Sequence, residues 1–211
     1  MSTFPNVEAF LLVGGKSSRM GRDKSLLEIN GVTQIQRAAN LLTPLVSRIT
    51  LVTSATQLAN PESTNRYSNL GLATVADRWP NTGPLGGIAT ALASAKPPWC
   101  LILACDMPFV TKDWITYLLD HIAQSQSNAD VIIPETQRGL EPLCAIYRTS
   151  CAPVLTATLE LGVRKVTDAL AELDLKRISE NQWRHFSPDG NLFGSLNTWQ
   201  DYLEARQRLK S

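Results

Sequence analysis

Residues 7–15 read VEAFLLVGG, and this stretch decides the fold class. The run from Val7 to Val13 is short and almost wholly apolar, and it ends at a pair of glycines. Such a run is typical of a strand that is buried on both faces of a parallel sheet. Residues 99–104 form a second apolar run, which ends abruptly before Asp106. Both runs predict central strands that are followed by polar loops.

Apolar runs and segments of helical spacing alternate along the rest of the chain. Further strands are predicted at 48–53, 72–75, 131–133 and 143–147. Helices are predicted at 33–45, 86–95, 112–124, 150–161, 166–173 and 198–210. This alternation predicts an α/β sandwich with a mostly parallel sheet, built from residues 1–211 as one domain. The Pro/Asn/Ser-rich stretch 60–69 is predicted to be a surface loop.

Composition limits the function classes. The chain has 211 residues, of which 44% are hydrophobic and 18% charged, so it is neither a disordered protein nor a coiled coil. Its formal net charge of +1 gives no bulk reason to expect nucleic acid or an anionic membrane as a partner. Any anionic ligand must therefore be held by local basic groups.

The cysteines and the apolar runs indicate the compartment. The four cysteines (Cys100, Cys105, Cys144 and Cys151) match no zinc-ligand spacing, and the first two are expected to be buried thiols. No apolar run approaches the ~20 residues that span a bilayer, and the amino terminus lacks the pattern of a secretory signal. We therefore expect a cytoplasmic protein with reduced thiols.

Polar loops follow three of the predicted strands, at 14–24, 77–87 and 105–108. Ligands of open α/β sheets bind at the carboxyl edge of the strands. Because parallel strands bring their carboxyl ends to one edge, the three loops predict a single site.

The first loop favours phosphate binding. Residues 12–24 read LVGGKSSRMGRDK, with two adjacent glycines, two neighbouring hydroxyls and four basic residues. Backbone amides, guanidinium and ammonium groups together suit a triphosphate. The spacing fits neither the G-x-x-x-x-G-K-[ST] nor the G-x-G-x-x-G signature, and a solvated basic turn remains the alternative.

Four motifs in order resemble the molybdenum cofactor guanylyltransferases, the MobA family. They are LVGGKSSRMGRDK at 12–24, ADRWPNTGPLGGI at 76–88, LACDMP at 103–108 and FGSLNTWQDY at 193–202. The resemblance implies a Rossmann-like three-layer sandwich of the nucleotidyltransferase type. It also implies a Mg²⁺-dependent reaction that moves GMP from GTP to the terminal phosphate of molybdopterin, forms the guanine dinucleotide cofactor and releases pyrophosphate.

The resemblance assigns the first loop to the nucleotide. Arg19 and Lys24 would contact the triphosphate as catalytic residues, with Lys24 near the α-phosphate. The backbone of the residues at the strand end would line the nucleotide pocket: Leu12, Val13, Gly14 and Gly15.

The resemblance assigns Asp106 to catalysis, nucleotide binding and Mg²⁺, and Asn197 to the same metal. A hard cation prefers carboxylate and phosphate oxygens, which fits this assignment. The alternative for Asp106 is a turn aspartate before Pro108. For Asn197 the alternative is an N-cap of the helix that follows.

The motif at 76–88 would contact the ribose and base. Asp77 would lie near the ribose, although a strand-end aspartate could equally cap a turn. Gly83, Pro84 and Leu85 open a helix whose N-terminus would face the nucleotide.

In the second half, Glu141, Pro142, Arg164 and Lys165 fall where the family binds the pterin substrate, and ordinary surface is the alternative. The resemblance also implies molybdenum cofactor synthesis proteins and apo-molybdoenzymes as partners.

Rival functions remain open at this point. Relatives that transfer CMP carry alanine where this chain has Gly14, which favours GTP, although Val13 departs from the usual alanine. Another small-molecule nucleotidyl transfer and non-catalytic cofactor delivery are further alternatives. Lys24 and Asp106 argue against mere delivery, because a binder needs no metal at the α-phosphate.

Overall fold

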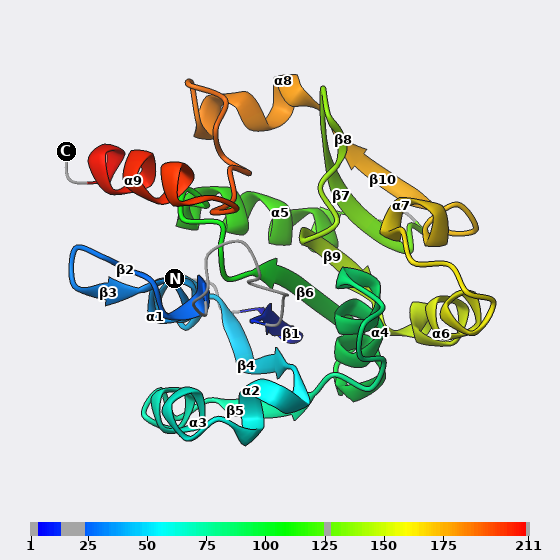
Figure 1. The fold of residues 1–211 in the computed structure, drawn as a ribbon. Coiled ribbons are helices and arrows are strands. Elements are labelled where there is room, and N and C mark those ends of the chain that lie inside the picture. The colour runs from blue at the N-terminus through cyan, green and yellow to red at the C-terminus, as the bar shows by residue number, and fades with distance from the viewer. Residues whose placement is uncertain (1–3, 14–23, 125–127, 210–211) are drawn as a thin grey trace.

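An eight-stranded sheet runs through the centre of the molecule (Figure 1). The computed structural model describes residues 4–13, 24–124 and 128–209. The strand order is β10-β7-β9-β6-β1-β4-β5, and β8 pairs with β7. The strands are β1 (Phe4–Leu12), β4 (Val46–Thr53), β5 (Ala73–Ala76), β6 (Trp99–Ala104), β7 (Val131–Thr136), β8 (Gly139–Leu140), β9 (Cys144–Arg148) and β10 (Leu175–Ile178).

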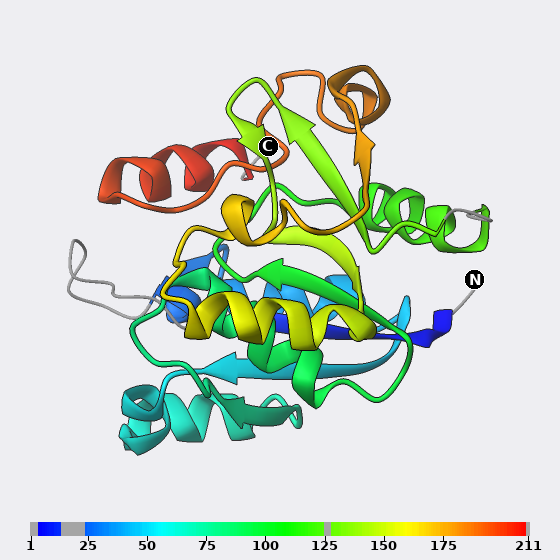
Figure 2. The same cartoon turned by 90° about the vertical axis from the view of Figure 1, so that its right-hand side faces the viewer.

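The predicted mostly parallel sheet is confirmed. β1 pairs in parallel with both β4 and β6, so that Leu12 lies opposite Val52 on one side and Ala104 on the other. β4 and β5 are parallel, as are β7 and β10, whereas β9 runs antiparallel to both β6 and β7. The arrowheads of β4 and β6 accordingly point the same way in Figure 2.

Helices cover both faces of the sheet and make three layers. In Figure 1, α1 and α5 lie on one side of the sheet, and α4 and α6 lie on the other. The α-helices are α1 (Gln34–Leu42), α2 (Ala55–Ala59), α3 (Pro61–Ser68), α4 (Pro84–Ser94), α5 (Lys112–Gln124), α6 (Ala152–Glu160), α7 (Val166–Ala169), α8 (Glu180–Trp183) and α9 (Trp199–Arg208). Short 3-10 helices are η1 (Lys24–Leu26), η2 (Thr149–Cys151) and η3 (Arg184–Phe186).

The alternation of side chains along β1 divides the core into two layers. Leu11 packs in the layer that contains Trp114 of α5, and Phe10 packs in the opposite layer with Leu85 of α4. All four side chains are buried. Burying an apolar side chain of this size contributes about 1.5–3 kcal/mol. The sequence-based expectation that this strand is buried on both faces is therefore confirmed.

A third, smaller core joins distant parts of the chain. It packs α9 against a hairpin of β2 (Glu28–Ile29) and β3 (Val32–Thr33). Leu27 and Ile29 from the hairpin side meet Tyr202 and Ala205 of α9 in this core. The carboxyl-terminal helix is thereby fixed to the segment that follows residues 14–23.

The prediction of a surface loop at 60–69 is wrong, because most of this stretch forms α3. Asn60 Oδ1 accepts a hydrogen bond from the amide of Ser63, and Pro61 is the first helical residue. Proline suits this position because its missing N–H would have no partner within the helix. Tyr67 at the other end is buried in the core. Asn-Pro here starts a helix and does not mark a loop.

All four cysteines are free and buried, which confirms the burial expected for Cys100 and Cys105. Cys144 Sγ accepts a hydrogen bond of 3.3 Å from Trp114 Nε1, and burial raises the pKa of the Cys144 thiol to about 12. Within the described part of the chain, none of the helices is both long and apolar enough to cross a membrane.

His121 of α5 is a buried polar residue whose ring is not compensated by hydrogen bonds. Both of its ring nitrogens are buried without a hydrogen-bond partner among the described residues, and the ring packs edge-on against Tyr117 at 4.8 Å. Burial, aided by the charge of Lys176, lowers the pKa of His121 below its ordinary value of 6.5, although Asp120 opposes this. The folded protein therefore favours the neutral imidazole.

We expect His121 to weaken the fold in acid. Below about pH 6.5 the unfolded chain binds a proton at this histidine more readily than the folded chain does, so stability falls as the pH falls. A His121→Leu variant should lose this part of the acid sensitivity. Thermal unfolding of both proteins at pH 5 and pH 8 measures the effect, and the exposed His185→Leu serves as the control. Equal acid sensitivity of His121→Leu and wild type would contradict the prediction.

Candidate active site

Three predicted site residues meet at the carboxyl edge of the sheet. Lys24 begins η1, Asp106 follows β6, and Asn197 precedes α9. The Nζ atom of Lys24 donates a hydrogen bond of 3.1 Å to Asn197 Oδ1 and lies 3.8 Å from Asp106 Oδ2. The side chains of Lys24 and Asp106 are 21% and 23% exposed, so they are accessible without being fully solvated. The structure thus brings together residues that are up to 173 positions apart.

Backbone hydrogen bonds fix Asn197 in this place. The amide of the preceding residue, Leu196, donates to the carbonyl oxygen of Asp106 at 2.9 Å. Asp201 Oδ2 accepts hydrogen bonds from the amides of Asn197 and Thr198, at 2.8 and 2.7 Å. The N-cap of α9 is Thr198, whose hydroxyl accepts from the Asp201 amide. The alternative role of Asn197 as the N-cap is therefore wrong, and its side chain is available to the site.

The charges at this site are partly desolvated. Burial raises the pKa of the Asp106 carboxyl, and the nearby ammonium of Lys24 opposes this rise. A carboxylate in such a place is stabilised by a positive charge beside it. The site therefore favours a cation next to Asp106.

The donor set at Asp106 and Asn197 fits Mg²⁺. A carboxylate oxygen and an amide oxygen both lie within 4 Å of one atom, Lys24 Nζ, and both are hard ligands. No group of three or more His, Cys, Asp or Glu residues suited to a metal occurs in the described ranges. Mg²⁺ in proteins is commonly held by one or two carboxylates together with water and substrate phosphates. The residues present therefore suit a metal that arrives with a phosphate ligand.

The strand end that was predicted to line the nucleotide pocket is already bonded within the protein. The Val13 amide donates to Val52 O at 3.0 Å, and Val13 O accepts from Gln57 Nε2 at 3.0 Å. Leu12 O accepts from the amide of Cys105. Pocket lining by Leu12 and Val13 stays a prediction. The other residues predicted in this loop, Gly14, Gly15 and Arg19, lie outside the described residues.

Asp77 stabilises the turn between β5 and α4. Its Oδ1 atom accepts hydrogen bonds from the Trp79 amide at 2.9 Å and from the Thr90 hydroxyl at 3.1 Å. The Thr90 hydroxyl in turn accepts from the amide of Arg78. The structure thus shows the turn-capping alternative for Asp77, and its contact with a ribose stays a prediction.

The start of α4 offers backbone groups to the carboxyl edge. Gly83 is the N-cap with φ of +70°, a left-handed conformation that glycine adopts without strain, and Pro84 is the first helical residue. The N-terminus of an 11-residue helix carries partial positive charge and suits an anion or a polar ligand. Leu85 is 0% exposed, so any ligand contact of this residue runs through its backbone.

Gly86 lies where the 77–83 turn folds closely over the first turn of α4. A Cβ atom at this position would overlap the hydroxyl oxygen of Thr82 and lie 2.7 Å from Trp79 O. A Cβ atom on the neighbouring Gly87 would lie 3.4 Å from Leu12 Cδ1, which is an ordinary contact. The turn can therefore keep its shape only if residue 86 has no side chain.

We expect Gly86→Ala to destabilise the protein by about 1–3 kcal/mol, because the added methyl group forces the turn away from the helix. Gly87→Ala is the matched control and should be neutral or stabilising, since alanine favours a helix over glycine by about 1 kcal/mol. Denaturant unfolding of the two variants measures the difference. Equal stability of the two variants would contradict the prediction, because it would show that the turn can shift at little energetic cost.

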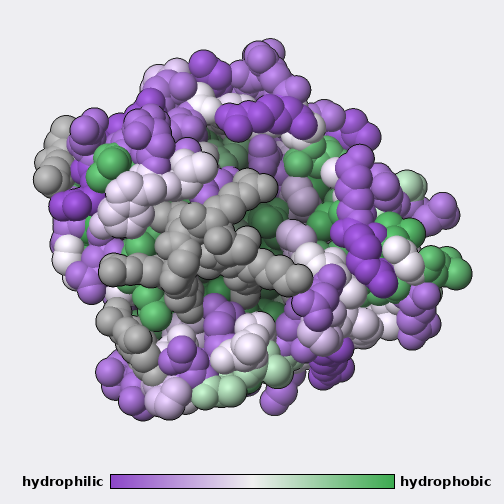
Figure 3. Space-filling view, in the orientation of Figure 1, coloured by the Kyte–Doolittle hydropathy of each residue, from purple (hydrophilic) through white to green (hydrophobic). Residues whose placement is uncertain are grey.

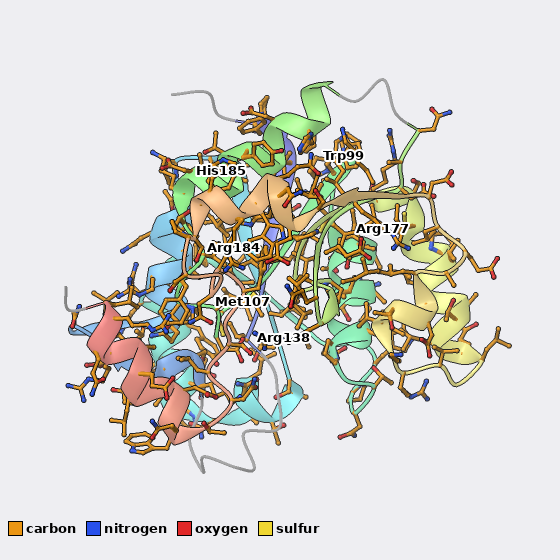
Figure 4. The ribbon with its side chains drawn as sticks, turned by 90° about the horizontal axis from the view of Figure 1, so that it is seen from above. Trp99, Met107, Arg138, Arg177, Arg184 and His185 are labelled. Carbon is orange, nitrogen blue, oxygen red and sulfur yellow. The ribbon has the colours of Figure 1, made fainter. Side chains whose placement is uncertain are left out.

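Besides the site at Lys24, Asp106 and Asn197, a cavity of about 290 Å³ lies beside the β7–β8 hairpin and is called the second cavity. Its walls include Glu141, the aromatic rings of Trp183 and Phe193, and the arginines Arg138 and Arg184. Figure 4, in which the molecule is seen from above, labels both arginines. Burial raises the pKa of Glu141, while the Thr136 hydroxyl and the charge of Arg138 oppose the rise. Glu180 also lines the cavity, which therefore combines two arginines, two carboxyl groups and two aromatic side chains.

Arg184 is held rigidly in this second cavity. Its Nη1 atom donates a hydrogen bond of 2.6 Å to Glu180 Oε1, and its Nε atom donates to Pro188 O. A Cβ atom at Gly190 would lie 2.6 Å from the same Nη1, so the guanidinium lies directly over this glycine. Neither arginine of the cavity was found from the sequence, because no motif marks them.

Arg164 and Lys165, which were also predicted to bind a pterin, do not line this cavity, and Pro142 only adjoins it after Glu141. Arg164 Nη1 donates to the carbonyl oxygens of Leu159 and Val163, near the end of α6. Lys165 forms an ion pair of 3.4 Å with Asp168. The structure therefore gives both basic residues local roles, and their pterin role stays a prediction.

The face that carries the first site is mixed in character. Figure 3 shows apolar residues in a recess near the centre of this face, bordered by hydrophilic residues. Such a combination is common in sites for small molecules, in which apolar walls surround a few polar groups.

Known proteins share both the sequence and the fold. Residues 9–175 match the MobA-like NTP transferase domain family. A probable molybdenum cofactor guanylyltransferase of Clostridium perfringens is 35% identical over 173 residues, covering 82% of this chain and 81% of the relative. A probable molybdenum cofactor guanylyltransferase of Peptoclostridium acidaminophilum is 31% identical over 202 residues, covering 94% and 88%. The crystal structure of molybdopterin-guanine dinucleotide biosynthesis protein A from Archaeoglobus fulgidus superposes with a TM-score of 0.81 at 25% identity, covering 96% of this chain and 98% of that one.

Proposed function

Because the chain belongs to the MobA-like NTP transferase family, we propose that it is the enzyme that transfers GMP from GTP to the terminal phosphate of molybdopterin. An oxygen of that phosphate attacks the α-phosphorus of GTP, and the bond to the β-phosphate oxygen breaks. The products are the guanine dinucleotide cofactor and pyrophosphate. Proteins that complete or receive this cofactor, such as apo-molybdoenzymes, are the partners that this reaction favours, and the cytoplasm is the compartment.

The convergence of Lys24, Asp106 and Asn197 carries this proposal. Phosphoryl-type transfer depends mainly on positioning and on neutralising charge, and it requires little covalent chemistry from the protein. The ammonium of Lys24 would neutralise charge at the α-phosphate, and the two oxygens would hold the metal. A Mg²⁺ ion bound by Asp106 and Asn197 would supply further neutralisation of the phosphate oxygens.

The second cavity is the favoured place for the acceptor. Arg138 suits a phosphate group, because guanidinium donates paired hydrogen bonds to its oxygens, whereas Arg184 already donates to Glu180 and to the carbonyl oxygen of Pro188. Glu141 can accept hydrogen bonds from ring N–H groups, and the largely buried Trp183 and Phe193 form an apolar wall of the cavity. Pro142, whose carbonyl oxygen accepts from the Tyr147 hydroxyl, would contribute from the adjoining loop. Arg164 and Lys165 would then act only on the outer rim.

Nucleotide binding is the direct test of this function. We expect calorimetry to show GTP binding at least tenfold tighter than CTP, a difference of about 1.4 kcal/mol, and only in the presence of Mg²⁺. Tighter binding of CTP would place the enzyme with the cytidylyl-transferring relatives and would overturn the argument from Gly14. If neither nucleotide bound, the proposed function would be wrong.

Substitutions at the site should remove turnover without unfolding the protein. We expect Lys24→Ala to lower pyrophosphate release by about 100-fold or more, which is typical for the loss of a transition-state charge contact. Asp106→Ala should abolish release, because the metal loses its carboxylate ligand. Asp120→Ala, on the exposed side of α5, is the control and should keep full activity. A fully active Asp106→Ala enzyme would contradict the assignment of Asp106 as a metal ligand.

A further inference from the structure

The turn that carries Lys24 is held by the carboxyl-terminal helix. Lys24 opens η1, and the chain continues through Leu27 into the β2–β3 hairpin, which packs on α9 in the third core. Asn197, the hydrogen-bond acceptor of Lys24, stands two residues before the same helix. Both ends of the Lys24–Asn197 contact therefore depend on where α9 lies.

Tyr202 makes the most direct connection between α9 and the Lys24 turn. Its hydroxyl donates a hydrogen bond of 2.7 Å to the carbonyl oxygen of Glu28, four residues after Lys24. The residue is only 7% exposed, and its ring packs against that of Trp199, tilted by 35°, with a centroid distance of 4.8 Å. The hydroxyl is thus fixed by packing on the same helix whose start holds Asn197.

A second hydrogen bond ties the hairpin to the far end of α9. Asn30 Nδ2 donates to Leu209 O at 2.7 Å, from a turn in which Asn30 and Gly31 have φ values of 55° and 75°. Leu209 directly follows the last helical residue of α9. The hairpin is therefore attached at two points along the helix.

We propose that Tyr202 is a positioning residue, which fixes the Lys24 turn so that the ammonium stays beside Asn197 and Asp106, where it can reach the α-phosphate of GTP. The lysine side chain has four rotatable bonds, so its Nζ atom is placed only if the backbone around it is fixed. A displacement of about 1 Å in such a group can lower a rate by about 100-fold. The inference rests on the proposed function, since it assumes that Lys24 contacts the triphosphate of GTP.

Tyr202 is the last residue of the motif at 193–202, which lies after the range that the family model matches. That match ends at residue 175, whereas α9 begins at Trp199. The helix thus adds to the site from outside the matched range, both through the N-terminal cap that places Asn197 and through the Tyr202 hydroxyl.

A double-mutant cycle tests this inference. Calorimetry should compare GTP binding, with Mg²⁺, to wild type, Tyr202→Phe, Lys24→Ala and the double variant. We expect Tyr202→Phe to weaken binding by about threefold to tenfold when Lys24 is present, as for the loss of one hydrogen bond. In the Lys24→Ala background the same substitution should change binding by less than about twofold, because the group it positions is gone.

Tyr147→Phe is the matched control for stability. Its hydroxyl also donates to a backbone carbonyl oxygen, that of Pro142 at 2.8 Å, but the residue lies in the core layer of α4 and α6. We expect this variant to lower the unfolding temperature to a similar extent and to leave GTP binding unchanged. If Tyr202→Phe does not fold, Asn30→Gly takes its place in the cycle. This variant keeps the left-handed turn and removes the side-chain amide that donates to Leu209 O.

Two outcomes would overturn the inference. If Tyr202→Phe leaves GTP binding unchanged, or weakens it equally with and without Lys24, then Tyr202 supports the fold alone. If wild-type protein binds no GTP, the proposed function fails instead, and circular dichroism shows whether the protein is folded. The two failures are therefore distinguishable.

Discussion

The parallel pairing of β1 with β4 and β6 is the constraint on which the site depends. Because the three strands run in one direction, the segments after Leu12, Thr53 and Ala104 all leave the sheet at the same edge. Close packing of β1 in two different core layers disfavours a shift of its register, since a shift of one residue would exchange side chains of different size between the layers. The position of Asp106 therefore follows from the packing of the core.

The central strands could be predicted from the sequence. The elements that complete the site, the β2–β3 hairpin and α9, could be predicted only in part. β1 and β6 are short, almost wholly apolar runs, and Asp106 follows the end of the second, so the apolar pattern alone placed it at the edge of the sheet. The β2–β3 hairpin was missed, although the Asn-Gly pair between Ile29 and Val32 is a strong hairpin signal. The contact of α9 with this hairpin is long-range, and no local pattern indicates it.

The stretch 60–69 shows why amino-acid composition led to the wrong prediction of a surface loop. Polar residues and a proline are typical of a loop, but the Asn-Pro pair caps α3 and Tyr67 anchors it. Tertiary packing decided the structure here, because the burial of one tyrosine stabilises a helix whose exposed residues have little preference for it. The same limit applies to Arg138 and Arg184, which share a cavity only after the β7–β8 hairpin and the start of η3 have come together.

Tyr67 also connects α3 to the candidate active site through hydrogen bonds. Gln57 Nε2 donates to Val13 O at 3.0 Å and to the Tyr67 hydroxyl at 3.4 Å, and that hydroxyl lies 3.3 Å from Ser25 Oγ. Val13 and Ser25 stand close to either end of residues 14–23. Breaking one member of a buried polar chain leaves its neighbours unsatisfied, which costs more than the bond itself contributes. The helices α2 and α3, which follow β4, therefore fix the end of β1 relative to the Lys24 turn. The carboxyl-terminal helix α9 holds the same turn through separate contacts.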